Sequence, residues 1–323
     1  MKKLSAVLVV LLLTAGSMFA QGKVSGKTYF DYTYNPDGTP TNSFEIHRVY
    51  IGYSANLSDN ISYKVTTDVG RVNNGKDNRL AAYLKYAQLK WKTQYGSFVF
   101  GLQGLNIFNV QEYNWGYRFV EKSAMDLHKF GSSADLGIGY YNKFAGKLNV
   151  SAILTNGTGY KKSENDDYKK LSFQVFYGDK KIKKDGNFNV GAVFTTESFD
   201  YISGTDTTTK STTVIGGFAA YQIAGLRVGA EYDILTKGGS SDVTKNIISV
   251  YADYAAMKNL HVFARFDKYD PNVDVDNDGS NYVVAGLNYK AGKGFSIAPN
   301  VRISSPETGD SSTLYKVNFE FKL

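Results

Sequence analysis

The C-terminal segment alternates strictly between apolar and polar side chains. Tyr315, Val317, Phe319, Phe321 and Leu323 take every second position, with lysine, asparagine and glutamate between them. Successive side chains of a β-strand point to opposite faces, so this pattern predicts a strand with one apolar and one polar face. Such a strand separates two different environments.

The same period of two recurs along the chain, and no long stretch has the spacing of an amphipathic helix. We expect about sixteen strands, most of them about 10 residues long, which is the length that a tilted strand needs to cross a bilayer. Their predicted ranges are 24–34, 43–57, 60–71, 79–93, 96–104, 133–143, 147–155, 168–178, 186–197, 211–222, 226–236, 245–255, 260–269, 280–290, 294–304 and 312–323.

Short and long connectors alternate between these strands, and only the turn at 179–185 blurs this rule. The short ones lie near 58–59, 93–95, 145–146, 223–225, 256–259 and 291–293, and the long ones near 35–42, 72–78, 105–132, 156–167, 198–210, 237–244, 270–279 and 305–311. A soluble β-sandwich or a β-rich adhesin would explain the alternation of apolar and polar residues, but not the alternation of short and long connectors. We therefore predict an all-β fold, a transmembrane antiparallel β-barrel with short periplasmic turns and long extracellular loops.

The first twenty residues have the organisation of a secretory signal peptide. Lys2 and Lys3 precede an apolar run from Leu4 to Ala15, which is too short to span a bilayer, and cleavage is expected after Ala20. A permanent N-terminal anchor is the alternative interpretation. Export as residues 21–323 places the barrel in the bacterial outer membrane and argues against a cytoplasmic function.

Composition excludes several kinds of site. The chain has no cysteine, so it has no disulfide, thiol nucleophile or zinc–thiolate site. Its basic residues are scattered, and export argues against nucleic acid as a partner. Removal of Lys2 and Lys3 lowers the formal net charge of +7 by two. The remaining excess of positive charge suggests a weak preference for anions.

The connector 105–132 is the longest, and long loops in compact domains usually have a function. We expect it to fold into the lumen and narrow the pore, although it could also lie outside and cover the mouth or a subunit contact. Its charged residues and its alternating aromatic residues are Glu112, Arg118, Glu121, Lys122, Asp126, His128 and Lys129, and Tyr113, Trp115, Tyr117 and Phe119.

Sixteen strands enclose a water-filled channel rather than a packed interior. The predicted function is therefore passive diffusion of small hydrophilic solutes or ions through a barrel surrounded by outer-membrane lipid. Besides the loop charges, the pore lining would include Lys64, Arg227, Arg265 and Arg302. One alternative is a substrate-specific channel for a sugar, peptide or anion, with Tyr113, Trp115 and Tyr117 as a stacking track. Another is a plugged structural or adhesive barrel.

Four segments carry a resemblance to a known family. They are FEIHRVYIG at 44–52, ISYKVTTD at 61–68, FVFGLQG at 98–104 and RFDKYDPN at 265–272. With the strand pattern around them, the chain resembles the sixteen-stranded porins of the bacterial outer membrane, especially the phosphate-selective porin O/P-like group. The resemblance implies a passive channel, a homotrimer and insertion by the barrel assembly machinery.

Two features depart from that group. Its phosphate-selective members carry a dense lumenal ladder of arginine and lysine, whereas the polar faces here mix both signs, for example Lys64 with Asp68 and Arg227 with Glu231. Phosphate selectivity is therefore not carried over. The chain also ends in Leu323 where a terminal phenylalanine is usual, although Phe319 and Phe321 keep the aromatic character of an assembly signal.

The sequence offers no cluster typical of an enzyme. A hydrolase needs a nucleophile, a base and an orienting group within hydrogen-bond reach. His47 lies toward the loop end of its strand and His261 toward the turn end of another, so the two are expected to lie about 25 Å apart. We therefore predict that the protein is not an enzyme and needs no cofactor.

The segment 274–279 matches the first half of a calcium-binding loop. Asp274, Asp276 and Asp278 stand at alternate positions before Gly279, but position 12 of the pattern is Ala285 instead of glutamate. A solvated acidic loop is the simpler interpretation. If calcium binds, it should raise the thermal stability of metal-stripped protein.

Overall fold

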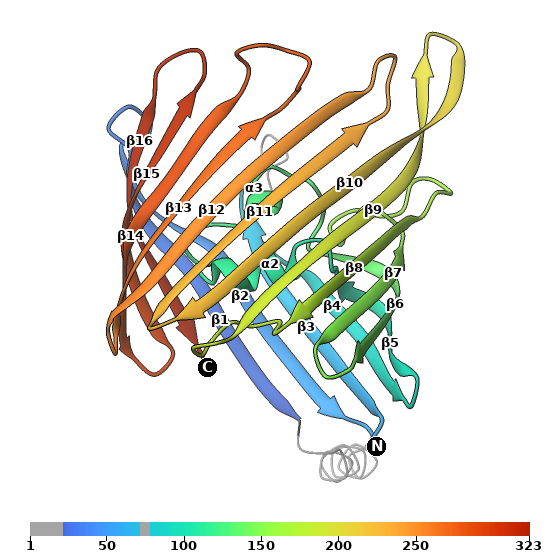
Figure 1. Cartoon of the computed structure of the whole chain (residues 1–323), viewed down its shortest axis with the longest axis horizontal. Helices are drawn as coiled ribbons and strands as arrows, with labels where there is room; N and C mark the ends of the chain where they lie inside the picture. Colours follow the sequence, from blue (N-terminus) through green and yellow to red (C-terminus); the bar gives the residue numbers. More distant parts are fainter. Residues whose placement is uncertain (1–21, 72–77) are drawn as a thin grey trace, which may run out of the picture.

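The computed structural model describes residues 22–71 and 78–323. The predicted signal peptide and most of the predicted loop 72–78 lie outside the described residues. Sixteen strands of the described ranges close into one antiparallel barrel, in which each strand pairs with its neighbours in sequence and β1 closes the ring against β16 (Figure 1). The strands are β1 (Lys23–Tyr34), β2 (Asn42–Asn56), β3 (Ile61–Arg71), β4 (Leu80–Thr93), β5 (Gly96–Gly104), β6 (Ala134–Phe144), β7 (Leu148–Thr155), β8 (Lys170–Gly178), β9 (Phe188–Ser203), β10 (Asp206–Ile223), β11 (Leu226–Lys237), β12 (Val243–Met257), β13 (Leu260–Asp270), β14 (Ser280–Gly292), β15 (Phe295–Pro306) and β16 (Ser312–Lys322).

The predicted fold class is confirmed, and each predicted strand is present. The largest difference is at 198–210, where a long loop was predicted and the prediction is wrong. Strands β9 and β10 instead continue as a paired ladder to Ser203 and Asp206, and Gly204 turns the chain with a φ of 63°. Threonines 207–209 favour the extended backbone, so this hairpin continues beyond the neighbouring strands (Figure 1).

The outer surface of the barrel is apolar. On β8, Phe173, Val175 and Tyr177 are exposed on the outside, whereas Ser172 and Gln174 are buried inside. Exposed apolar side chains around a closed barrel form the lipid-facing band of an outer-membrane protein, and this places the protein in the bacterial outer membrane. Neither helix of the described ranges is long and apolar enough to cross a membrane.

Two β-bulges interrupt the alternation on the wall formed by β1–β5. Thr66 pairs with Tyr86 and Thr67 with Leu84, which leaves Lys85 as the extra residue of β4. His47 is likewise the extra residue of β2, because it lies between the two β2 residues that pair with Tyr29 and Phe30 of β1. A bulge re-aims side chains, because two residues of one strand then oppose a single residue of the other.

Replacing Gly101 with alanine is expected to destabilise the barrel. Gly101 has a φ of 104°, and an added Cβ would lie 2.4 Å from the carbonyl oxygen of Ala87. Strained backbone of this kind costs about 1–3 kcal/mol. Heat-dependent gel mobility should show a lower unfolding temperature for Gly101→Ala. The control Gly217→Ala should match wild type, since nothing lies within 4 Å of its Cβ position.

Candidate functional site

The connector between β5 and β6 lies inside the barrel. It begins and ends side by side, because the Leu105 amide donates to the Ser133 carbonyl at 3.1 Å. It contains the helices α2 (Asn109–Trp115) and α3 (Ala124–Leu127), which both lie within the ring of strands (Figure 1). Helix α2 ends at Gly116, whose φ of 77° is the left-handed conformation that favours glycine. We call residues 105–133 the inner loop.

Two buried apolar clusters attach the inner loop to the wall. In the first, loop residues such as Ile107, Val110 and Met125 pack against side chains from β7–β12, including Ile153 and Val214. In the second, Trp115, Tyr117, Phe119 and Val120 pack against Tyr29, Tyr251, Phe263, Val284 and Ala298. Because most of these side chains are less than a tenth exposed, the loop and this part of the wall form a packed interior.

Amide side chains hold the first half of the inner loop. The Asn106 side chain donates to Ser151 Oγ at 2.9 Å and accepts from Ser172 Oγ at 2.5 Å. Asn114 and Asn189 exchange two hydrogen bonds of 2.8 Å between their side-chain amides. These buried polar groups are therefore paired with one another, as close packing away from water requires.

Arginine side chains hold the second half. Arg302 forms an ion pair with Glu121, with 2.7 Å between Nη1 and Oε2, and it also donates to the Val120 carbonyl. Arg265 donates to the Lys122 carbonyl and forms a buried ion pair with Asp267. The loop therefore crosses the lumen and reaches the far side of the barrel at β13 and β15.

Two titratable groups of the loop have shifted pKa values. Burial lowers the pKa of His128 to about 4, so its imidazole is neutral at pH 7. Burial opposes ionisation of Glu121, but the positive charges of Arg302 and Arg265 outweigh it and hold the pKa of that carboxyl below its ordinary value. Glu121 therefore remains an anion at neutral pH and keeps its ion pair.

Replacing Arg302 with methionine is expected to loosen the inner loop. The change leaves Glu121 buried with its guanidinium partner removed, and breaking a buried ion pair in this way costs about 3–5 kcal/mol. Trp115 is 2% exposed, so in a Trp91→Phe background its fluorescence reports the packing of the loop. The denaturation midpoint of that signal should fall.

The matched control for this experiment is Arg71→Met. Arg71 has an equally short ion pair with Glu45, 2.6 Å, but its side chain is 41% exposed. An exposed pair contributes little, so the midpoint should hardly move. Equal shifts in the two variants would contradict an anchoring role for Arg302.

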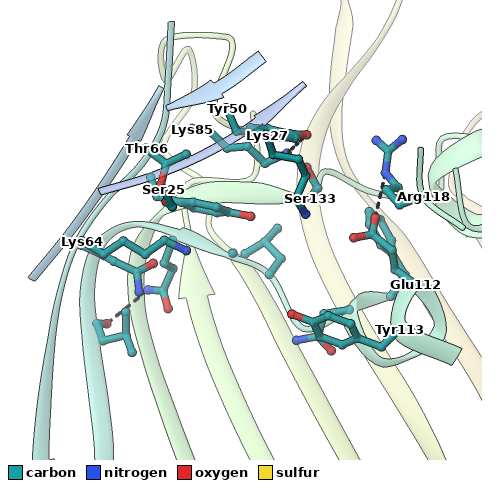
Figure 2. A pocket seen from close by; sticks show the side chains of 18 of the residues that line it. Ser25, Lys27, Tyr50, Lys64, Thr66, Lys85, Glu112, Tyr113, Arg118 and Ser133 are labelled. Atoms are coloured by element: carbon teal, nitrogen blue, oxygen red, sulfur yellow. Dashed lines mark hydrogen bonds and ion pairs between the residues drawn. The ribbon is translucent and has the colours of Figure 1, made fainter. Parts of the chain in front are cut away.

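One side of the lumen remains open. A space of about 670 Å³ lies between the inner loop and the wall formed by β1–β5. In Figure 2, Lys27, Lys64, Lys85, Thr66 and Tyr50 come from the wall, and Glu112, Tyr113 and Arg118 face them from the loop.

Two further spaces adjoin this one along the same wall. A space of about 350 Å³ shares Lys64, Gln88 and Lys90 with it and reaches the short turn between β2 and β3. On the other side of the loop, a space of about 170 Å³ shares Tyr29 and Arg118 with it. The three spaces share lining residues along this wall, and we call them together the β1–β5 route.

The side chains of the central space are strongly basic. Among the residues that the structure describes, seven cationic side chains line it, with Glu112 as the one acidic side chain. Arg118 is neutralised by Glu112 at 2.9 Å and by Asp126 at 3.0 Å. Within residues 22–71 and 78–323, no carboxylate forms an ion pair with five of the lysines, and these are Lys27, Lys64, Lys85, Lys90 and Lys180.

The predicted lining residues are divided between this route and the packed interior. Glu112, Arg118, Lys64 and Tyr113 line the central space. Glu121, Lys122 and Arg302 line the smaller space beyond the loop. Arg227 and Arg265 instead hold the loop, Asp126 is paired with Arg118, and Lys129 is exposed.

The three aromatic residues of the predicted stacking track have different surroundings. Tyr113 is 40% exposed and lines the central space. Trp115 and Tyr117 are 2% and 4% exposed and pack around Phe263. They offer no open ring face to a solute, so Tyr113 alone of the three lies on the route.

Several lining residues were missed by the sequence analysis. They include Lys27, Lys85, Lys90 and Lys180, and the hydroxyl groups of Tyr50 and Ser133. Lys27 and Lys90 occupy polar positions of alternating segments and could have been found by extending the lumenal face along each strand. Lys85 belongs to a bulge, so counting by two from the two ends of its strand places it on opposite faces and leaves its side undecided.

The three histidines lie in different surroundings. His47 contacts Asp31 at 2.7 Å, and His261 lies between Asp253 at 3.2 Å and Lys290 at 2.9 Å. His128 stacks on Tyr269. In the part of the chain that the structure describes, no serine or threonine hydroxyl is hydrogen-bonded to any of these imidazoles.

The acidic segment 274–279 lies in the connector between β13 and β14, and its three aspartates are exposed. Within the described ranges, no group of three or more histidine or acidic side chains is arranged to hold a metal ion. Calcium binding at Asp274, Asp276 and Asp278 stays a prediction.

No family model and no curated protein matches the chain. Solved structures do match it. OmpT of Vibrio cholerae, an outer-membrane protein described in a trimer form, has a TM-score of 0.70 at 13% identity, over 94% of this chain and 99% of that chain. The anion-selective porin from Comamonas acidovorans has a TM-score of 0.65 at 11% identity, over 94% and 99%. The outer-membrane channel DcaP of Acinetobacter baumannii has a TM-score of 0.64 at 12% identity, over 94% and 97%.

At these identities the likeness shows the fold, which is that of a porin barrel over nearly the whole described chain. The predicted resemblance to sixteen-stranded porins is confirmed at this level. None of these three neighbours is described as phosphate-selective, so the resemblance to that group stays a prediction.

Proposed function

We propose that this protein is an outer-membrane porin that passes small hydrophilic solutes and ions by diffusion along the β1–β5 route. The observation that carries the proposal is the space of about 670 Å³ between the inner loop and the wall, with adjoining spaces on both sides. Its lining is rich in charged and hydroxyl side chains, which hydrated solutes require. No reacting group is needed for this function.

The charge of the lining further supports a preference for anions. Five lysines without a carboxylate partner in the described ranges face one space, and low-dielectric walls focus their field. This preference should exceed what the net charge of the whole chain suggests, because charges on the outer loops do not line the central space. The anion-selective porin from Comamonas acidovorans has a similar fold, and its selectivity is consistent with the proposed preference for anions.

We also propose a homotrimer. The support is the trimer form described for the similar barrel of Vibrio cholerae. Mass measurement of the detergent-solubilised protein would test it.

The channel function is tested by recording single channels of the refolded protein in planar bilayers under a salt gradient. We expect stable ohmic steps and a reversal potential on the anion side. Silence from protein shown to be folded and inserted would instead indicate a plugged structural barrel. A reversal potential on the cation side would overturn the anion preference and leave the channel intact.

A further inference from the structure

We infer that the turn between β8 and β9 is a docking surface for an acidic peptide segment of a partner protein. The turn comprises residues 179–187 and lies at the end of the barrel that holds the C-terminus, which is the predicted periplasmic end (Figure 1). The inference does not depend on the channel function, because it concerns binding at the surface. The other connectors at this end are much shorter, and they are 57–60, 94–95, 145–147, 224–225, 258–259 and 293–294.

The first observation is a group of exposed lysines on this turn and on the turn beside it. The Gly178 amide donates to the Lys147 carbonyl at 3.0 Å, and this hydrogen bond joins the two turns. In residues 22–71 and 78–323, no carboxylate forms an ion pair with any lysine of the group. We call the group the turn patch, and its members are Lys147, Lys180, Lys181, Lys183 and Lys184.

The second observation is that the two acidic residues of the turn hold its backbone and do not pair with the turn patch. Asp179 accepts from the side-chain amide of Asn187 at 2.9 Å, and Asp185 accepts from the Gly225 amide at 3.3 Å. Ile182, in the middle of the turn, is 2% exposed. The acidic and apolar residues therefore fix the turn, whereas its ammonium groups remain available to a partner.

The third observation is that part of the turn patch faces the mouth of the lumen and not the surrounding lipid. The Nζ of Lys181 lies 4.5 Å from the centre of the Tyr113 ring, and the Nζ of Lys180 lies 5.8 Å from it. Tyr113 belongs to α2, which lies inside the ring of strands. Lipid headgroups lie outside the wall, so this geometry favours a partner that approaches from the aqueous side.

The number of lysines favours a partner that carries several carboxylates in one segment. An exposed ion pair contributes little by itself, so a single carboxylate would gain little from the turn patch. A peptide with glutamate or aspartate at several positions can pair with several lysines at once, and complementary charge also speeds association. An acidic segment of a protein therefore fits the turn patch better than a small solute does.

The test is fluorescence anisotropy of a labelled peptide in which glutamate alternates with serine, titrated with the folded barrel in detergent. We expect the triple variant Lys181→Gln, Lys183→Gln and Lys184→Gln to bind it about tenfold more weakly than wild type, which corresponds to about 1.4 kcal/mol. Replacing the same three lysines by arginine keeps the charge and should preserve the affinity. Any binding of the peptide inside the lumen contributes equally to these proteins, because the three lysines do not line the central space.

The matched control is the triple variant Lys258→Gln, Lys290→Gln and Lys293→Gln, which changes three exposed lysines at two other turns of the same end. Heat-dependent gel mobility first shows that each variant is folded. The control should bind the peptide nearly as well as wild type, and equal losses in the two glutamine variants would overturn the inference. The difference between them should persist in nanodiscs that contain anionic lipid. Its disappearance there would mean that lipid headgroups occupy the turn patch, and this would also overturn the inference.

Discussion

Replacing Lys27, Lys64 and Lys90 together by glutamate is expected to convert an anion-preferring channel into a cation-preferring one. All three side chains line the central space, and no carboxylate of the described ranges forms an ion pair with them. Two unit charges 4 Å apart interact by about 1 kcal/mol in water and about 4 kcal/mol near a protein surface. Reversing the charge of three side chains on one route should therefore change the ratio of anion to cation permeability by at least about tenfold.

The measurement is the reversal potential under a salt gradient. A control with the same change in net charge is the triple glutamate variant of Lys143, Lys183 and Lys293, which are exposed near the turns and do not line the central space. Its reversal potential should stay close to that of wild type. Equal shifts of the reversal potential in both triple variants would mean that the preference for anions depends on the net charge of the protein and not on the residues that line the route.

Shortening the inner loop is expected to raise single-channel conductance several-fold. The loop packs against β7–β15 and fills the lumen on that side, whereas a bare sixteen-stranded barrel holds a wide aqueous channel. Residues 106–132 can be replaced by a glycine–serine turn, because Leu105 and Ser133 are already hydrogen-bonded neighbours.

Heat-dependent gel mobility must first show that the shortened barrel is folded, since the change uncovers apolar residues such as Ile153 and Val214. Conductance is then compared with wild type under the same salt. An unchanged conductance in a folded barrel would show that the inner loop does not limit the flow. That result would also mean that the narrowest point of the pore is formed by the barrel wall.

The fold could be predicted because a barrel wall has different surroundings on its two faces. Alternation at 315–323, and at similar segments along the chain, predicted the strands to within a few residues. The error at 198–210 arose because threonines and polar residues fit both a loop and a strand hairpin outside the membrane. Nothing in a membrane-based pattern marks a hairpin that continues into water.

The candidate site was less predictable, for two physical reasons. The first is that the sequence analysis weighed the charges of the inner loop, whereas its apolar residues decide where it packs. The wall carried a signal for this, because adjacent apolar pairs such as Val214 and Ile215 present one side chain to each face. Such pairs predict a lumenal surface that something apolar must cover.

The second reason is that bulges cannot be read from alternation. His47 and Lys85 are each the extra residue of a bulge and each reaches the lumen, but counting by two from the residues after the bulge places each toward lipid and counting from the residues before it places each inside. A single positive charge facing lipid would be costly, and that cost was the one available sign of a break in register. Ion pairs across the barrel, such as that of Arg302 with Glu121, depend on how the loop crosses and have no sequence signal.

The most direct test of the β1–β5 route uses the absence of cysteine in the chain. Lys64→Cys places one thiol on the route, and Lys183→Cys places one at an exposed position off it. A sulfonate-bearing methanethiosulfonate is added during single-channel recording, and mass spectrometry confirms that both thiols react. We predict a stepwise fall in conductance for Lys64→Cys alone. Full modification of that cysteine with unchanged conductance would contradict the account, because solutes would then cross the barrel elsewhere.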